Sequence, residues 1–132
     1  MEIGNIERHF GVQLAAGVST GPGTLMNVNS SGTGRLADAS SSLPAHGIAL
    51  TSGAGTKTAG MSQFVALYRS ARVTNVDYTT LTIGNTAYLG EDGQVATTSG
   101  GLAQNVGICL KTDEVFMDLD LHFPADGRPN VA

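Results

Sequence analysis

The feature that most restricts the fold is the stretch VFMDLDLHF, residues 115–123, where an apolar residue recurs at every second position. Successive side chains of a β-strand point to opposite faces, so a period of two predicts a strand with one buried face and one face in water. The positions assigned to the buried face are Val115, Met117, Leu119, Leu121 and Phe123. The wet face carries Asp118, Asp120 and His122. No segment after residue 10 shows a helical period.

The composition favours the same fold class. Glycine accounts for 18 of the 132 residues and charged residues for only 14%, so the chain lacks the Glu, Lys, Arg and Leu that long surface helices need. We count about nine or ten short strands, with turn signals every eight to twelve residues or so. This pattern predicts an all-β fold, a compact antiparallel β-barrel or tulip-like domain.

The length predicts a single domain with flanking segments. We expect an N-terminal arm over residues 1–10, one β domain over 11–123 and a C-terminal tail over 124–132. The longest strand is expected over 64–76, and its first half is apolar on both faces, which is typical of a strand covered on both sides. Two hairpins are expected, one joining 87–89 to 94–97 and one joining 106–111 to 115–123.

The chain contains a near repeat. Residues 47–50 read GIAL and residues 107–110 read GICL, an offset of 60 (107 − 47). Upstream, GRLADAS at 34–40 resembles GQVATTS at 93–99, an offset of 59 (93 − 34). These two elements predict an internal duplication with the halves related by pseudo-twofold symmetry. We expect Ile108, in the repeated tetrapeptide, and Leu119, on the buried face of the last strand, to be core residues. The alternative is a chance similarity between β segments rich in small residues.

Charge and targeting signals exclude several classes of partner. The net charge is −4 and the seven basic residues are scattered, so we expect no nucleic-acid partner. No apolar stretch approaches the length of a membrane span, and residues 1–10 lack the apolar core of a signal peptide. We therefore expect no membrane partner and a soluble protein made in a cytoplasm.

The residue types that usually perform catalysis do not form a recognisable constellation. The three histidines lack the spacing of metal ligands, and no serine lies in Gly-x-Ser-x-Gly. The loop GAGTKTAG, residues 53–60, lacks the register of a phosphate loop. Lys111 lies at a hairpin turn but lacks the adjacent methionine of a lipoyl or biotinyl carrier, since Met117 is distant. Cys109 aligns with Ala49, which predicts a small buried residue rather than a nucleophile. We expect no enzyme activity, no metal and no cofactor.

A group of acids near the last hairpin leaves an alternative open. Asp118 and Asp120 share one strand face, and Asp113 and Glu114 lie at the preceding turn. Paired carboxylates can bind calcium or transfer protons. We favour the simpler interpretation, in which they are solvated charges that discourage edge pairing.

The second half of the chain carries a recognisable pattern. The stretch VTNVDYTTLTIGNTAYLGEDGQVATTSGGLAQNVGICL contains Leu-Thr-Ile-Gly, Ala-Tyr-Leu, Asp-Gly-Gln-Val and Val-Gly-Ile in that order. This pattern resembles the small capsid decoration (cement) proteins of tailed bacteriophages. The resemblance covers residues 45–121, whereas the Gly- and Ser-rich first third does not match residue by residue.

The resemblance implies a β-barrel or tulip-like domain that assembles as a homotrimer on the outer surface of the phage head. Its partner there would be the major capsid protein, whose neighbouring copies it would hold together in the virion after synthesis in the host cytoplasm. The alternative is a carbohydrate- or receptor-binding β domain of a fibre or head appendage. Such a domain needs exposed aromatic rings, and this chain has no Trp, three Tyr and four Phe.

Two apolar segments are candidates for the interface. The arm carries apolar residues without a core of its own, so we expect it to order against a neighbouring subunit. The alternative is that Phe10 fills the base of its own barrel. The apolar run that begins at residue 64 offers a second surface that a trimer could cover. The predicted interface residues are Ile3, Ile6, Phe10, Phe64, Val65 and Leu67.

Overall fold

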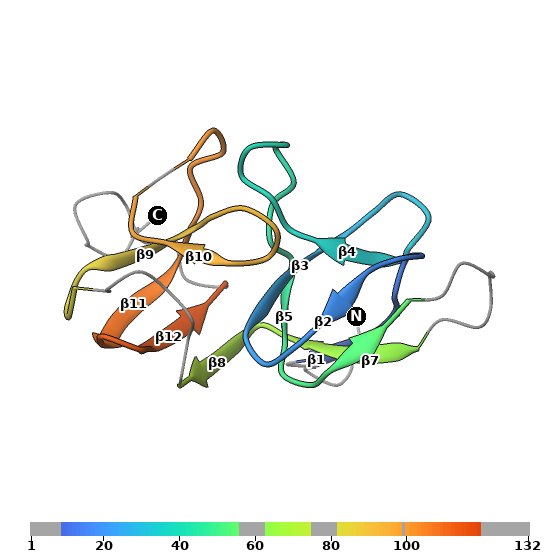
Figure 1. The fold of residues 1–132 in the computed structure, drawn as a ribbon, viewed down its shortest axis with the longest axis horizontal. Helices are drawn as coiled ribbons and strands as arrows, with labels where there is room; N and C mark the ends of the chain where they lie inside the picture. Colours follow the sequence, from blue (N-terminus) through green and yellow to red (C-terminus); the bar gives the residue numbers. More distant parts are fainter. Residues whose placement is uncertain (1–8, 56–62, 75–81, 99, 120–132) are drawn as a thin grey trace, which may run out of the picture.

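A computed structural model describes residues 9–55, 63–74, 82–98 and 100–119. Over these ranges the chain forms twelve strands and no helix, which confirms the all-β fold class. The strands form two five-stranded antiparallel sheets and one two-stranded sheet. The sheets lie in two lobes side by side (Figure 1). The arm up to residue 8, residues 120–123 and the tail over 124–132 lie outside the described residues.

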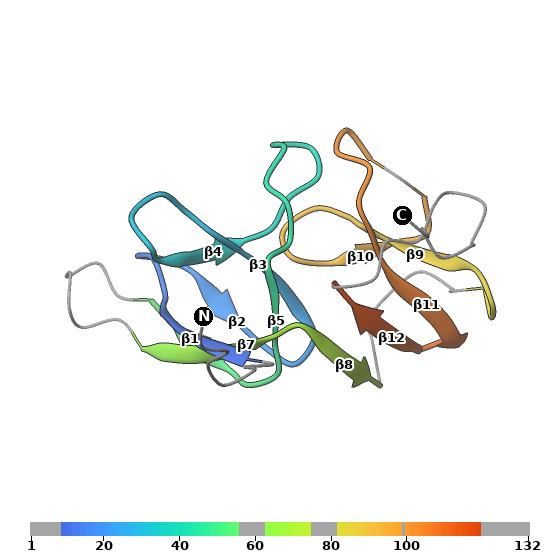
Figure 2. The same ribbon diagram turned by 180° about the vertical axis from the view of Figure 1, so that it is seen from behind.

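The first sheet curls on itself. In spatial order its strands are β1 (His9–Gln13), β7 (Phe64–Tyr68), β5 (Gly47–Ala49), β3 (Thr24–Val28) and β4 (Gly34–Leu36). Leu14 forms a parallel bridge with Gly34, and the amide of Ala15 donates to the Gly34 carbonyl at 2.9 Å. The chain leaving β1 therefore meets the opposite edge of the sheet, which makes this lobe a half-barrel (Figure 2).

The second sheet contains both predicted hairpins. Its spatial order is β10 (Val95–Ala96), β9 (Thr86–Leu89), β11 (Asn105–Lys111), β12 (Glu114–Asp118) and β8 (Ser70–Val73). Leu89 lies opposite Val95 in one hairpin, and Cys109 lies opposite Val115 in the other. The two-stranded sheet pairs β2 (Ser19–Thr20) with β6 (Gly53–Ala54). β6 thus occupies the start of the segment predicted to be a loop.

The two large sheets have the same topology. Numbered in chain order within each lobe, the strands of both sheets are arranged first, fifth, fourth, second, third. The strand of Gly47 and the strand of Gly107 are both central, and each pairs with the strand that ends its repeat. Ile48 lies opposite Tyr68 as Ile108 lies opposite Phe116. The internal duplication predicted from the sequence is therefore present in the fold.

The repeated glycine has a steric cause in both lobes. A Cβ on Gly47 would lie 2.6 Å from the Cβ of Leu67, and a Cβ on Gly107 would overlap the carbonyl oxygen of Phe116. In each repeat the strand that follows passes too close to the central strand for a side chain at this position. In both repeats, glycine is thus required at this position because a neighbouring strand comes too close for a side chain.

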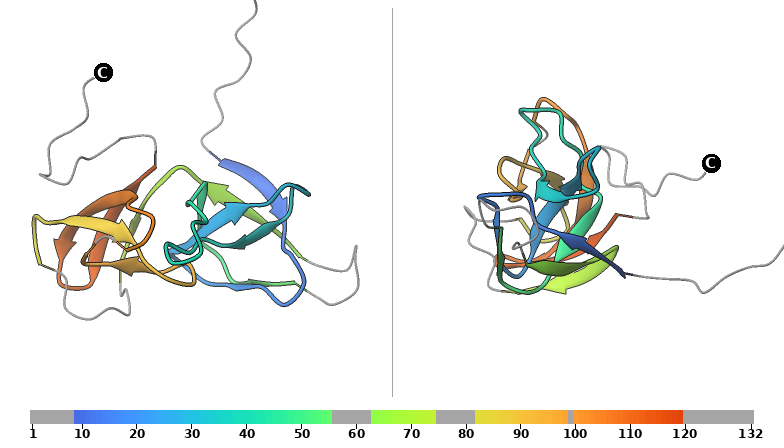
Figure 3. Two further views of the ribbon diagram at one scale, coloured as in Figure 1. Left: turned by 90° about the horizontal axis from the view of Figure 1, so that it is seen from above. Right: turned by 90° about the vertical axis from the view of Figure 1, so that its right-hand side faces the viewer.

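Two apolar clusters fill the lobes. The first lies inside the half-barrel and contains Val12, Leu14, Met26, Ala49, Val65 and Leu67. The second cluster joins the inner face of the second sheet to side chains of the first lobe, among them Leu25 and Ile48. Leu25 and Met26 are adjacent and serve different clusters because neighbouring residues of a strand face opposite sides. The second cluster therefore joins the two lobes, which lie against each other in the ribbon (Figure 3).

The backbone of the second lobe also bonds to the first. Gly93, in the β9–β10 turn, donates its amide to the Ala37 carbonyl at 2.6 Å and accepts from the Leu25 amide at 2.8 Å. Glycine stands here because its φ is +77° and because a Cβ at this position would lie 2.9 Å from the Leu25 oxygen. The Gln104 amide binds the backbone of Ala45 through both of its polar atoms, at 2.7 and 3.0 Å.

The expected pseudo-twofold symmetry is wrong. A twofold axis would bury equivalent residues alike where the repeats meet. Instead, Ile48 is fully buried in the shared cluster, whereas the equivalent Ile108 is partly exposed and belongs to neither cluster. The outer face of the first sheet packs on the inner face of the second. The prediction that Ile108 is a core residue is corrected by the same observation, while Leu119 is buried as expected.

The long strand predicted over 64–76 is two strands in different sheets. The break falls at Arg69, whose carbonyl accepts from the Leu119 amide at 2.8 Å. The apolar run is also not covered on both sides: Val65 and Leu67 are buried, whereas Phe64 is 71% exposed. The last strand follows the predicted alternation over its described part, since Val115 and Met117 are buried and Asp118 is partly exposed.

Candidate functional site

The structure separates the predicted interface residues. Ile3 and Ile6 lie outside the described residues. Phe10 is part of β1, which starts within the expected arm, and it packs against the cluster of the half-barrel. Val65 and Leu67 belong to that cluster and are unavailable to a partner. Phe64 is the member of the set whose described side chain is mostly exposed.

Phe64 lies next to the edge strand β1, on the strand β7 that separates β1 from β5. It begins β7 and lies opposite Gln13, the last residue of β1. Among the described strands, β1 is hydrogen-bonded along its length to β7 alone. An edge strand beside an exposed aromatic ring suits the addition of a partner's strand, because the backbone supplies hydrogen bonds and the ring supplies selectivity. We call His9–Gln13 with Phe64–Tyr68 the β1–β7 edge.

The other end of the β1–β7 edge carries a ring pair. His9 lies opposite Tyr68, and their ring centroids are 5.2 Å apart with an interplanar angle of 32°. Such a tilted pair is within the range of favourable aromatic contact. Because the chain enters β1 at His9, the arm joins the edge at this ring pair and not at Phe64. The two ends of the edge therefore present different chemistry.

The second lobe exposes two further large apolar residues. Ile83, in the segment before β9, is 64% exposed, and Phe116 on β12 is 37% exposed. Phe116 lies between Ile108 and Arg72 in the register of the sheet. The two exposed phenylalanines thus stand in different sheets and do not form a shared platform for a sugar ring.

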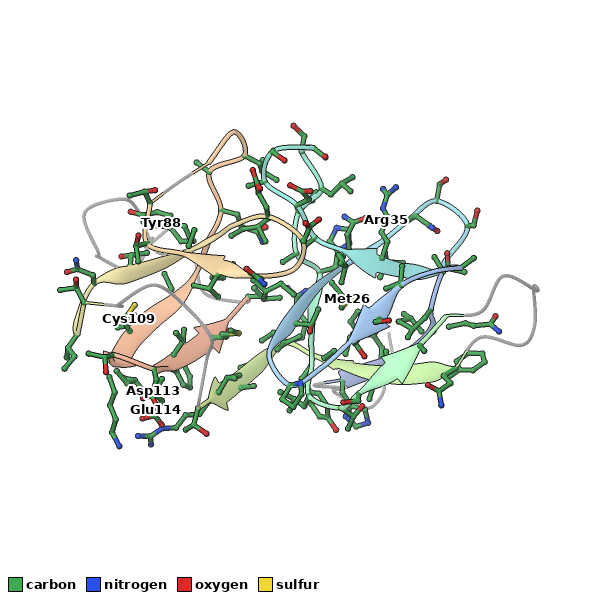
Figure 4. All side chains as sticks on the ribbon, viewed as in Figure 1. Met26, Arg35, Tyr88, Cys109, Asp113 and Glu114 are labelled. Carbon is green, nitrogen blue, oxygen red and sulfur yellow. The ribbon has the colours of Figure 1, made fainter. Side chains whose placement is uncertain are left out.

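Glu114 is buried, contrary to the expectation that the acids of this hairpin are solvated. Its side chain is only 3% exposed and forms an ion pair with Arg72, with Lys111 3.6 Å from its second oxygen (Figure 4). The hydrogen bond from Arg72 is the main cause that lowers the pKa of Glu114. Its Oε2 accepts no hydrogen bond from the described residues. Because two cations already face this carboxylate, it is poorly suited to bind calcium.

A row of polar residues crosses three strands on the outer face of the first sheet. Arg35 on β4 lies opposite Asn27 on β3, and His46 precedes β5 on the other side of Asn27. Asn27 is buried, accepts from Arg35 Nε at 2.8 Å and donates to the Pro44 carbonyl at 2.8 Å. No sequence pattern predicted this row, since its members are far apart along the chain and meet only through strand pairing.

Cys109 and His46 have side chains that can react, but each is held in place by the surrounding structure. Cys109 is buried, and this burial raises the pKa of its thiol, which agrees with the prediction of a small apolar residue. His46 accepts a hydrogen bond from the Val28 amide through Nδ1 at 2.9 Å. Within the described ranges, no group of His, Cys, Asp and Glu side chains could hold a metal ion.

No protein-family model matches the chain, and no curated protein matches it. Over the part of the chain that the structure describes, there is also no helix long and apolar enough to cross a membrane.

Proposed function

We propose that the chain is a non-enzymatic capsid decoration protein of a tailed bacteriophage, which binds the outside of the head as a homotrimer and stabilises contacts between major capsid proteins. The sequence pattern over residues 45–121 that resembles this family supports the proposal. The all-β fold with two joined repeats is compatible with it. The observation that carries the proposal is the exposed Phe64 on the β1–β7 edge.

This edge has the properties of a docking surface. Val65 and Leu67 anchor β7 in the half-barrel core, so the exposed ring of Phe64 is presented on a strand that is already fixed. Binding through a strand that is already ordered costs less conformational entropy than ordering a mobile segment. Aromatic residues are enriched in protein interfaces, and the edge strand β1 adds backbone groups for pairing with a partner. In this proposal the major capsid protein contributes the opposing surface.

The alternative of a carbohydrate-binding domain receives less support. Sugar rings stack on aromatic faces, but Phe64 and Phe116 stand in different sheets and Tyr68 is paired with His9.

The test is binding to heads assembled without this protein. Phe64→Ser removes the exposed ring and should weaken binding at least about tenfold, as expected for a central interface aromatic. Ile83→Ser is the matched control, because it removes an apolar side chain of comparable exposure from the other lobe. We expect that variant to bind as the unmodified protein does. Equal binding of Phe64→Ser and the unmodified protein would contradict the proposal.

A further inference from the structure

Strand pairing places three polar side chains on one face of the first sheet. Asn27 lies opposite Arg35, and Met26 lies opposite Gly47, so Asn27 faces the position of His46 on the other side. Side chains directly opposite in an antiparallel pair are about 5 Å apart at Cβ. This row lies beside Leu25 and Ile48, on the outer face where the second lobe packs. It therefore lies at the junction of the lobes.

Arg35 is held by a neutral partner. Its Nε donates to the amide oxygen of Asn27, and Asn27 is in turn fixed by the Pro44 carbonyl. Arg35 forms no ion pair with any described residue. Its side chain points away from β4 (Figure 4). A guanidinium anchored in this way keeps its full charge and offers its two terminal nitrogens to a planar or tetrahedral anion.

His46 is fixed in one tautomer. Its Nδ1 accepts from the Val28 amide, so the neutral ring must carry its proton on Nε2, and this nitrogen is a hydrogen-bond donor. Arg69, which follows β7, donates to the carbonyl of His46. Burial lowers the pKa of His46, and the charges of Arg69 and then Arg35 lower it further. The positive charges that act on this ring thus come from Arg69, between β7 and β8, and from Arg35 on β4.

We propose that Arg35 and His46 form a binding site for an oxyanion, either a phosphate or a carboxylate. The Arg35 fork and the Nε2 proton of His46 supply the hydrogen bonds, and Asn27 fixes the position of Arg35. This site uses side chains of β4 and of the residue before β5 and includes neither β1 nor Phe64, and it does not depend on the proposed capsid function. A carboxylate could come from a partner protein or from free solution, and the chemistry of recognition is the same.

The test follows the His46 ring by NMR while inorganic phosphate is added to the full chain at constant ionic strength. The site predicts a saturable shift and a rise in the pKa of His46, because a bound anion favours the charged ring. Acetate in place of phosphate shows whether a carboxylate suffices: saturation by both defines a general oxyanion site, and saturation by phosphate alone assigns the phosphate class. The same response to chloride would show screening only and would overturn the proposal.

Substitutions locate the site. Arg35→Gln should weaken phosphate binding about tenfold or more, because a charge-assisted pair is lost. Lys111→Gln removes the same charge from the second lobe and should leave binding unchanged. If Arg35→Gln fails to fold, Arg35→Lys keeps the charge but loses the fork, and it should bind severalfold more weakly than the unmodified chain. Full affinity in the folded Arg35→Gln or Arg35→Lys variant would contradict the site.

Discussion

Ile48 and Ile108 occupy equivalent positions in the two repeats, but Ile48 is fully buried between the lobes and Ile108 is partly exposed. The difference arises because the outer face of the first sheet packs on the inner face of the second sheet.

The two repeats also differ in length. From Ile48 to Tyr68 the chain runs 20 residues (68 − 48), and from Ile108 to Phe116 it runs 8 (116 − 108), so this part of the first repeat is 12 residues longer.

The additional residues of the first repeat explain how each core is closed. They include β6, and a Cβ on Gly53 of this strand would lie 2.7 Å from Val65 Cγ1 and 3.2 Å from Leu14 Cδ1. The β2–β6 sheet therefore packs on the cluster of the half-barrel. The second repeat lacks such a strand among its described residues, and the first lobe closes its core instead.

Substitution of the two isoleucines should have unequal effects. Ile48→Ala leaves a cavity in the shared core and should lower the free energy of unfolding by about 2–5 kcal/mol. Ile108→Ala removes a partly exposed side chain and should cost about 1 kcal/mol or less. Urea denaturation of both variants measures the difference. Similar losses would mean that the repeats bury their equivalent residues alike.

The repeated glycines should both resist substitution. Gly107→Ala places a methyl group against the backbone of Phe116, and Gly47→Ala places one against Leu67, so each should destabilise the fold by about 1–3 kcal/mol or more. Gly107→Ala should be the worse, because backbone cannot move aside as a side chain can. Gly11→Ala is the control, since a Cβ at Gly11 would meet no atom of a more distant residue within 4 Å. Melting temperatures check the order, and an unaffected Gly107→Ala variant contradicts it.

Local patterns predicted those parts of the fold that local interactions determine. Both hairpins and the buried face of Val115 and Met117 followed from alternation and turn residues. The break at Arg69 and the burial of Glu114 did not, because each depends on strands that are distant in the sequence. Arg72, the partner of Glu114, lies 42 residues away along the chain. The polar row of Arg35 and His46 was missed for the same reason.

Acid should weaken the second sheet through Glu114. The pKa of Glu114 is lowered in the folded chain, chiefly by the hydrogen bond from Arg72, below its ordinary value of 4.5. As the pH falls below 4.5, the Glu114 carboxylate takes up a proton in the unfolded chain before it does so in the folded chain. The stabilisation that the ionised Glu114 gives the fold is therefore complete above that pH and is lost as the pH falls through the folded-state pKa. In Glu114→Gln this part of the pH dependence should disappear. Urea midpoints measured from about pH 7 downward test it; an unchanged acid slope would contradict the role of Glu114.

Removal of residues 1–8 should separate folding from binding. His9 pairs with Tyr68, so a chain that begins at His9 keeps every strand of the first sheet and should keep its melting temperature. If the arm orders against a neighbouring subunit, as its apolar residues predict, this truncated chain should bind heads at least about tenfold more weakly. If the truncated chain binds heads as tightly as the full chain does, the arm does not contact the partner. Docking would then depend on Phe64.

A reconstruction of phage heads incubated with the purified protein would show whether the chain decorates them. The proposal predicts density for a trimer on the outer surface, centred on a local threefold axis as a symmetric trimer requires, with the β1–β7 edge and Phe64 against the major capsid protein. Heads that remain bare at saturating protein, or lone copies bound away from the threefold axes, would contradict it.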